Sequence, residues 1–330
     1  MARRTKIPYA KRATTYQQQI ALLKSRGVQI VDENKALEYL SDIGYYRLGF
    51  YIYPFEQTYP FLDHRRTHNV LPGTTIEDIV AFYYYDLDLR NILNRYLSRI
   101  EVALRTTIIY ELSNRYQANP WWYVDPTIVD ASFINTFTNR FYGNIKDKDP
   151  IKRHHHRYLE PYAPAWKVME YMTLGNLENL YDKLLSSNDK SLISQKFNEP
   201  AIGTFKNYLS VIREVRNSCA HGNVIVDMGL TSCVQSGAAC PTLPIGSQNT
   251  FYGAIRVIDF ILRQVSVNRS QDMWNEIHRA TQQLYTKAPS LRPFVERKTG
   301  IKLPSSAKET AEKHSIIHKI SKFIAKLLHN

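Results

Sequence analysis

Three polar residues that can transfer protons or bind phosphate recur at helical spacing near the middle of the chain. Arg213, Asn217 and His221 are each four residues apart, so on a helix they lie along one stripe. Arg216 lies about 140° around the same helix from His221, and its long side chain can still reach the same cleft or a partner's. Histidine transfers protons near neutral pH, and arginine holds phosphate through two hydrogen bonds. Together these residue types suit cleavage of an RNA strand.

The element that must position these residues is predicted to be a helix that ends at Gly222. Val211, Ile212, Val215 and Cys219 recur at helical spacing and give the helix an apolar face. Glycine commonly follows the last turn of a helix, because it adopts the left-handed conformation without strain. The polar stripe is therefore expected to lie opposite a buried face and close to a helix end.

A purely structural reading of the same residues is also open. An arginine and a histidine five residues apart recur by chance, since both are common residue types. In this reading Arg213 pairs with Glu214 or Glu170, and His221 only decorates a helix C-terminus, where its charge opposes the dipole. The spacing alone does not separate the two readings.

Similarity over a longer stretch favours a functional site. The segment Arg216–His221 resembles the Arg-Asn-x3-His signature of HEPN ribonucleases. Its surroundings resemble the Abi_2 family of phage abortive-infection proteins, of the AbiD and AbiF types. The similar segments follow the family's order over roughly residues 15 to 225: Gln18–Gly27, Leu40–Leu48, Tyr85–Arg90, Ile100–Thr106 and Pro164–Glu170.

The resemblance implies a fold, an activity and residue roles. The fold would be all-α, a HEPN-like helical bundle with additional N-terminal and C-terminal helices. The enzyme would be an endoribonuclease that needs no metal or other cofactor, with His221 as general base toward the ribose 2′-hydroxyl or general acid toward the leaving 5′-oxygen. Arg216, with Arg213, would hold the scissile phosphate. Asn217 would fix the histidine ring or cap a neighbouring backbone group.

The resemblance also implies partners and a biological role. Two chains would face each other and pool their Arg-to-His helices, which makes the expected enzyme a homodimer with a composite active site. The RNA product would carry a 2′,3′-cyclic phosphate, or its hydrolysed form, and a 5′-hydroxyl. The role would be phage defence by growth arrest, with the nuclease silent until infection or restrained by an antitoxin, for which a structured RNA is one candidate.

Two function classes other than the nuclease are possible. A non-catalytic RNA-binding protein could use the same basic helix only to hold phosphates. A nucleotidyl-transferring or AMP-transferring toxin is disfavoured, because the chain has no Gly-Ser motif followed by paired aspartates to hold magnesium. The nuclease and the RNA-binding protein therefore remain the two hypotheses.

Composition and charge fit a helical protein with a polyanionic partner. The 330 residues are 44% hydrophobic, enough for a sizeable core, and only 13 glycines argue against a glycine-rich β or α/β design. The net charge of +13 favours nucleic acid, because lysines and arginines displace condensed counterions, although acidic membrane or no partner fits the charge as well. Three cysteines without a CxxC pair indicate neither a disulfide framework nor a zinc site.

The expected location is the cytoplasm. The N-terminal residues carry charge with no apolar run behind it, so they are not expected to form a signal peptide. The chain contains no run of about 18 apolar residues of the kind that spans a membrane. A soluble protein without a membrane span is therefore predicted.

Four segments are expected along the chain. Residues 1–73 form an N-terminal helical and aromatic segment, and residues 74–225 form the HEPN-like core. Residues 226–304 combine an irregular excursion with helices that complete the bundle, and residues 305–330 form a basic amphipathic tail helix. This tail is expected to dock on the body or on a partner subunit, although acidic membrane or RNA would also suit it.

The longest helical pattern runs from Ile76 to Gln117 without a proline or glycine. Within it, Glu101 and Arg105 stand four apart in the favourable order of acid before base. The resemblance makes both residues site candidates, with a structural ion pair as the alternative. Glu170, in the later Pro164–Glu170 block, is expected to orient Arg213 or Arg216.

Two further stretches could contact RNA. In the aromatic segment Tyr45–Phe55, Arg47 and the tyrosines could stack on unpaired bases, but most of these rings are expected to pack helices together. The charged stretch 146–157 is predicted to be a loop that contacts phosphate through Arg153, His155 and Arg157, or is merely solvated. Its three consecutive histidines cannot face one ion on regular backbone, so no metal site is predicted.

The remaining helices follow from apolar spacing and from caps. They are expected near residues 15–27, 33–44, 127–145, 164–185, 191–197, 250–267, 271–285 and 291–297, with an irregular stretch over residues 222–249.

Overall fold

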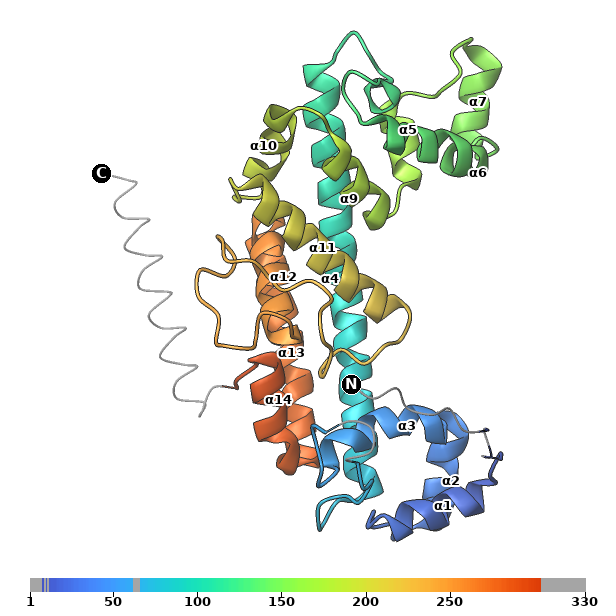
Figure 1. The fold of residues 1–330 in the computed structure, drawn as a ribbon, viewed down its shortest axis with the longest axis vertical. Helices are drawn as coiled ribbons and strands as arrows, with labels where there is room; N and C mark the ends of the chain where they lie inside the picture. Colours follow the sequence, from blue (N-terminus) through green and yellow to red (C-terminus); the bar gives the residue numbers. More distant parts are fainter. Residues whose placement is uncertain (1–7, 9, 11, 62–65, 304–330) are drawn as a thin grey trace, which may run out of the picture. The chain divides into compact units, whose positions relative to one another are not determined.

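The computed structural model of the protein describes residues 8, 10, 12–61 and 66–303 (Figure 1). Over these residues the chain forms helices joined by turns and loops, with isolated β-bridges and no β-strand. The prediction of an all-α fold is confirmed. The tail helix expected over residues 305–330 lies outside the described residues.

The chain divides into two compact units. The first contains residues 1–88 and 283–294, and the second contains residues 89–282 and 295–330, as far as these are described. Three helices, α4 (Ile76–Arg115), α13 (Val267–Lys287) and α14 (Arg292–Thr299), contribute residues to both units. The four-segment division expected from the sequence remains a prediction.

The first unit begins with three short helices, of which the first two start at side-chain caps. Helix α1 starts after Thr15, whose side chain accepts a hydrogen bond from the Gln18 amide while the Gln18 side chain accepts one from the Thr15 amide. Asp32 caps the second helix, since its side chain accepts a hydrogen bond from the Lys35 amide. These helices and the aromatic helix after them are α1 (Tyr16–Ser25), α2 (Glu33–Asp42) and α3 (Tyr45–Ile52), followed by the turn η1 (Tyr53–Phe55).

The aromatic segment mainly builds core, as expected. Tyr51 is fully buried, and its ring meets Phe82 and Tyr83 edge to face at centroid distances of 5.6 and 5.2 Å. The Arg47 guanidinium lies over the Tyr51 ring at 5.7 Å, so it is held by this core. Tyr46 is 83% exposed and is an exception to the packing.

In the second unit the core forms on one side of α4. Its apolar residues are spaced three or four apart, which aligns them along the helix and lets them be buried together. Removing each such side chain from water contributes roughly 1.5–3 kcal/mol, which explains why no break interrupts this helix. The fully buried members are Leu89, Leu93, Leu97, Ile100, Leu104, Ile108 and Leu112.

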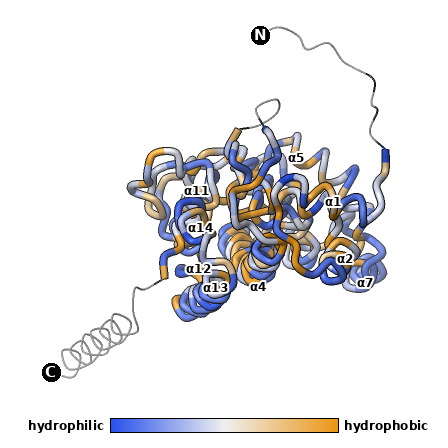
Figure 2. The backbone as a smooth tube through the Cα atoms, turned by 90° about the horizontal axis from the view of Figure 1, so that it is seen from below, coloured by the Kyte–Doolittle hydropathy of each residue, from blue (hydrophilic) through white to orange (hydrophobic). Residues whose placement is uncertain are grey.

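The other helices of this unit follow α4 along the chain. Figure 2 shows hydrophobic residues gathered along α4 and mainly hydrophilic ones along α13. Between α4 and α9 the chain forms η3 (Trp122–Val124), α5 (Ala131–Thr136), η4 (Phe137–Tyr142), α6 (Gly143–Ile145), α7 (Asp149–Arg157), α8 (Ala165–Val168) and η5 (Met169–Tyr171). It continues with α9 (Leu174–Lys183), α10 (Ser187–Lys196), α11 (Ile202–Ala220) and α12 (Phe251–Val265). After α13, η6 (Pro289–Leu291) lies in the first unit, and α14 (Arg292–Thr299) begins there and ends in the second.

Two helices predicted as continuous are interrupted or shortened. The expected helix over residues 127–145 begins at Ala131, because the Asp130 side chain accepts a hydrogen bond from the Ser132 amide and caps it there. The expected helix over residues 164–185 breaks before Leu174, because Thr173 and Asn176 form a capping box that starts α9. In both cases a polar side chain captures a backbone amide and resets the helix start.

Helix α11 carries the predicted apolar face. Val211, Ile212 and Val215 are fully buried, and Cys219 is 8% exposed. The helix packs against α9 and α12 and runs across α4 in Figure 1. The prediction of a helix ending at residue 222 with one buried face is therefore confirmed.

The end of α11 is closed by a Schellman motif. His221 is the C-cap residue of α11, and Gly222 follows in the left-handed conformation at φ 72°. The Asn223 amide donates to the Ser218 carbonyl at 2.9 Å, and the Gly222 amide donates to the Cys219 carbonyl at 3.4 Å. This turn fixes the backbone that carries His221.

The irregular stretch after α11 is tied back to that helix. The Asn207 side chain donates to the Cys233 carbonyl at 3.0 Å and accepts from the Gln235 amide at 2.9 Å. Glu214 accepts from the Thr231 amide at 2.8 Å. The stretch contains no helix or strand that would pair its backbone groups. Side chains on α11 form hydrogen bonds with some of these groups instead.

Replacing Gly222 with alanine should destabilise the second unit by about 1 kcal/mol, because alanine adopts positive φ only with strain. Gly222→Asn should cost less, since asparagine tolerates this conformation. Urea unfolding followed by tryptophan fluorescence measures both, because this unit holds all four tryptophans of the chain. Equal stability of the alanine variant and the unmodified protein would contradict the role assigned to the turn.

Candidate functional site

The polar face of α11 presents the predicted residues on the side away from its buried face. Arg213, Arg216 and Asn217 are partly exposed, and His221 is exposed. All four belong to the second unit and to the last turns and cap of one helix. Their common placement follows from the helical period that aligned the apolar residues on the opposite side.

Arg216 is held in place without being fully engaged. Its Nε lies 3.9 Å from a Glu101 carboxylate oxygen, and its Nη1 donates a long hydrogen bond of 3.5 Å to Asn217 Oδ1. Charge-assisted hydrogen bonds between nitrogen and oxygen are usually near 2.8 Å, so both contacts are weak. Since the side chain is 33% exposed, its guanidinium retains donors for a ligand.

Glu101 and Arg105 form a largely buried ion pair on α4. They lie 3.0 Å apart, and their side chains are only 16% and 11% exposed. Arg105 also donates to the Met172 carbonyl at 2.9 Å and lies 3.8 Å from Glu170. The sequence-predicted Glu101, Arg105 and Glu170 are therefore brought together beside Arg216.

Arg105 and Glu101 make different contacts in this cluster. Arg105 is engaged by two carboxylates and by the carbonyl at the η5–α9 turn, so it fastens that turn to α4. Glu101 uses one oxygen for Arg105 and directs the other toward Arg216. Two carboxylates and two guanidiniums balance in charge, which lowers the cost of keeping Glu101 and Arg105 away from water.

Glu170 and Asn217 do not make the contacts expected from the sequence. Glu170 lies beside Arg105 and does not orient Arg213 or Arg216. The Asn217 side chain contacts Arg216, and its backbone carbonyl accepts the His221 amide at 2.9 Å. His221 occupies the cap, where the backbone leaves the helical conformation, so its ring no longer follows the helical stripe.

Arg213 pairs with Glu178 of α9, a residue that the sequence analysis missed. It pairs with neither of its expected partners: Glu214 accepts from the Thr231 amide, and Glu170 lies beside Arg105. Gly175 was the available signal, since a glycine inside a helix often marks a close approach. A Cβ built at Gly175 would lie 3.3 Å from Arg213 Cδ, so the arginine stem passes tightly over α9.

His221 forms the exposed end of the site. Its imidazole makes no hydrogen bond or ion pair with any residue in the described part of the chain. The ring is therefore accessible to a ligand and is not oriented by a neighbouring side chain. A proton-transferring group at this position would receive its orientation from a bound substrate or from a second chain.

The basic stretch 146–157 was predicted to be a loop, and this is wrong. Residues Asp149–Arg157 form α7, with Pro150 in its first turn and with Ile151 and His154 buried. The fixed φ of proline suits the start of a helix, so Pro150 fits where it stands. The regular backbone separates the consecutive histidines onto different sides.

The three RNA-contact candidates of α7 differ in their surroundings. Arg153 and Arg157 are exposed, and Arg157 lies over the Tyr158 ring at 5.6 Å. His155 is half-buried and its Nε2 forms a hydrogen bond of 2.8 Å with the Tyr142 hydroxyl. None of the three has an ion pair or hydrogen bond with the Glu101 cluster among the described residues.

Within residues 8, 10, 12–61 and 66–303, no three or more His, Cys, Asp or Glu residues are grouped to hold a metal ion. No helix in that part of the chain is long and apolar enough to cross a membrane.

The fold and the site together define a helical protein that presents an arginine and a histidine at the end of a packed helix. The family model described as Abi-like protein, Abi_2, matches residues 38–227, which include α4, α9 and the whole of α11. The chain therefore belongs to the Abi_2 family. No curated protein and no solved structure was found to match it.

Replacing Glu101 with glutamine should lower the free energy of unfolding by about 1–3 kcal/mol, because it weakens the hold on the buried guanidinium of Arg105. The matched change Glu170→Gln should cost less than about 1 kcal/mol, since Glu170 is 63% exposed and water screens its ion pair. Urea unfolding followed by tryptophan fluorescence compares the two. Equal losses would contradict the central place assigned to Glu101.

His154 makes the stability of the second unit depend on pH. Burial, together with the nearby positive charge of Lys167, lowers the pKa of His154 below its ordinary value of 6.5. The unfolded chain therefore binds this proton more readily, so the contribution is complete above pH 6.5 and is lost as the pH falls below it. His154→Phe should flatten this decline in urea unfolding measured above and below pH 6.5. An unchanged slope would contradict the prediction.

Proposed function

We propose that the protein is a metal-independent endoribonuclease that acts in abortive infection, as a defence against phage. The observation that supports this best is the pairing of a weakly engaged arginine with an accessible histidine on one helix end. Arg216 keeps donors for a phosphate, and His221 has no competing partner in the described chain. Their spacing matches the Arg-to-His motif of HEPN ribonucleases.

In this proposal Arg216 binds the scissile phosphate and balances the charge that builds up on it during cleavage. Glu101 holds the guanidinium from behind, at a distance that permits movement toward the substrate. His221 removes the proton from the ribose 2′-hydroxyl or gives one to the leaving 5′-oxygen. Attack of the 2′-oxygen on phosphorus then forms the 2′,3′-cyclic phosphate as the 5′-oxygen leaves.

The proposal includes a homodimer. Cleavage uses a general base and a general acid, and the motif of one chain supplies a single histidine. Two chains related by a two-fold axis would bring two copies of α11 together and provide both groups. Such an arrangement would also give the unpartnered imidazole of His221 a neighbour that orients it.

Further basic residues would extend the RNA contact beyond the cleaved bond. Arg213 lies one turn before Asn217 on α11, although its pairing with Glu178 must loosen for it to bind phosphate. Exposed Arg153 and Arg157, with His155, offer a second basic helix. Arg47 is proposed as a contact in the first unit. The net charge of +13 supports this general affinity for nucleic acid.

The proposed biological setting is the cytoplasm of an infected cell. The Abi-like family name supports a role in abortive infection. A nuclease that arrests growth must be silent in healthy cells, so the proposal includes restraint by an antitoxin, with a structured RNA as one candidate. The basic surface that binds substrate would also bind such an RNA.

An RNA-binding protein without catalytic activity is the second candidate. The observation in its favour is that no described side chain orients the His221 ring, whereas catalytic histidines usually have such a partner. In this alternative Arg216 and Arg213 hold phosphates and His221 has no chemical role. The two candidates differ in whether strand cleavage depends on the imidazole.

Replacing His221 with alanine should reduce RNA cleavage by about 10²–10⁴-fold, because the proton-transferring group is lost. Affinity for RNA and the urea unfolding midpoint should change little, since the side chain is exposed and makes no hydrogen bond or ion pair within the described chain. The measurement is cleavage of total RNA in excess chelator, with the cut ends mapped. His156→Ala, which removes another exposed histidine, is the matched control.

Three outcomes separate the candidates. Cleavage lost in His221→Ala and kept in His156→Ala, with chelator present, supports the nuclease. Binding without cleavage by the unmodified protein supports the RNA-binding alternative. Cleavage that survives His221→Ala ends the catalytic assignment of this histidine.

A further inference from the structure

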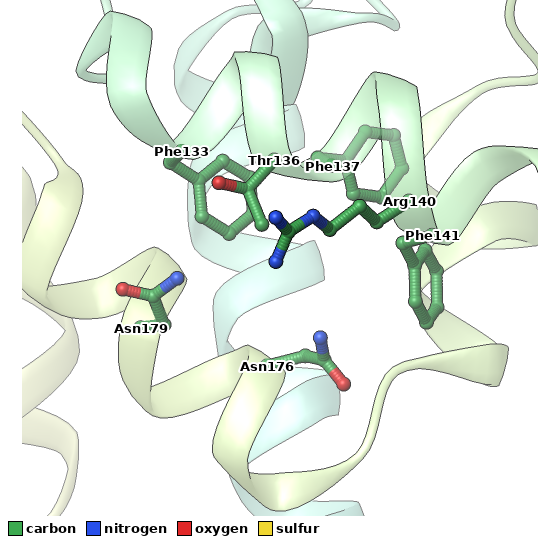
Figure 3. A pocket seen from close by; sticks show the side chains of 7 residues that line it. All are labelled: Phe133, Thr136, Phe137, Arg140, Phe141, Asn176 and Asn179. Carbon is green, nitrogen blue, oxygen red and sulfur yellow. The ribbon is translucent and has the colours of Figure 1, made fainter.

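A pocket away from the Arg216 cluster opens between α9 and the helical segment α5–η4 (Figure 3). Its volume is about 180 Å³. Three phenylalanine rings, one guanidinium, two side-chain amides and one hydroxyl line it, and no carboxylate does. The lining residues are Phe133, Thr136, Phe137, Arg140, Phe141, Asn176 and Asn179.

The apolar wall of the pocket consists of phenylalanine rings that pack on one another. Phe133 and Phe137 are buried and stacked, with centroids 5.9 Å apart and planes inclined by 16°. Phe141 packs on Phe137 at 5.3 Å and is partly exposed, so its ring has surface left for a ligand. The backbone of η4 is π-helical, a rare wide turn that is frequent at functional sites.

The polar groups of the pocket mainly offer hydrogen-bond donors. Figure 3 shows Arg140 reaching between the phenylalanine rings toward α9. The Arg140 guanidinium makes no hydrogen bond or ion pair with any other described residue. The Asn176 oxygen accepts from the Thr173 amide and hydroxyl in the capping box, which leaves its amino group toward the pocket. Asn179 adds a second amide.

Aromatic walls with a free guanidinium select a planar ring that carries hydrogen-bond acceptors. Unpaired bases are held in this way, by stacking on aromatic side chains together with hydrogen bonds to their edges. Guanine presents the adjacent acceptors O6 and N7, which match the two parallel donors of arginine. Adenine presents a donor beside N7, which would face the guanidinium unfavourably.

We propose that this pocket binds a guanine base, with Arg140 on its O6 and N7 edge and with Phe141 stacked on its face. The source of the base is an unpaired guanosine of the RNA substrate or a free guanine nucleotide. The strand source deepens the proposed nuclease function and rests on it, because the pocket would then give the cleaved RNA its sequence.

Helix α9 connects this pocket to the Arg-to-His helix. Asn176 and Asn179 line the pocket, whereas Glu178, between them in sequence, holds Arg213 of α11. Consecutive helical residues point in directions about 100° apart, so one short helix serves both sites. A base held in the pocket would thus be fixed to the same packed pair of helices that carries Arg216 and His221.

The test uses labelled decamers that carry a 2′-O-methyl group on every ribose, with uridine throughout and one central guanosine or one central adenosine. Fluorescence anisotropy measures their binding. These strands have no 2′-hydroxyl nucleophile, so binding is read whether or not the protein cleaves RNA. The guanosine decamer should bind roughly tenfold more tightly than the adenosine decamer. Arg140→Ala should abolish that preference, and Phe141→Leu should weaken both decamers by roughly tenfold while keeping their ratio.

The control is Arg269→Ala, which removes another exposed arginine and should keep the guanosine preference. Competition by guanosine monophosphate against adenosine monophosphate identifies the source. Arg140-dependent binding of the mononucleotide without binding of the decamers supports the base site and assigns it to free nucleotide. Equal affinity of the unmodified protein for both decamers and both mononucleotides overturns the proposal, as does a preference that survives Arg140→Ala. The His221→Ala cleavage result stands independently of either outcome.

Discussion

The placement of the candidate site depends on one charge pair kept largely away from water. Glu101 and Arg105 stand on a helix whose neighbouring residues Ile100 and Leu104 are fully buried, so each charge must find its partner within the protein. Arg105 consequently fastens the η5–α9 turn, and Glu101 consequently faces Arg216. The relation between α4, α9 and α11 thus follows from satisfying two buried charges, with hydrophobic packing around them.

The same requirement leaves Arg216 partly free. Glu101 is already satisfied by Arg105 at 3.0 Å, and the remaining oxygen attracts Arg216 only from 3.9 Å. A closer contact between Glu101 and Arg216 would make the guanidinium unavailable to a ligand. Without any contact to Glu101, the guanidinium would have no preferred direction. An intermediate distance of this kind combines a preferred direction with available donors, which is a useful property for a group that must bind phosphate only when substrate arrives.

Sequence patterns predicted the parts of this arrangement that depend on local chemistry. The apolar spacing of α4 and the buried side of α11 with its glycine stop were found because period and cap residues lie close together in the chain. The same patterns did not predict which carboxylate pairs with which arginine. Glu178 and Glu170 compete for arginines that are distant in sequence, and only the packing of α9 against α11, allowed by Gly175, decides that Arg213 takes Glu178.

The misplaced starts of α5 and α9 share a physical cause, because in both a short polar side chain accepts a hydrogen bond from a backbone amide. Thr173 ends one helix and starts another by binding an amide, and in doing so it turns Asn176 toward the Arg140 pocket. The recurrence of phenylalanine at positions 133, 137 and 141 was visible in the sequence, but its meaning depended on a helix that begins again at Leu174. The capping box of Thr173 and Asn176 therefore interrupts the helix and also places a polar side chain in the wall of the Arg140 pocket. The break at residue 173 thus helps to form this pocket.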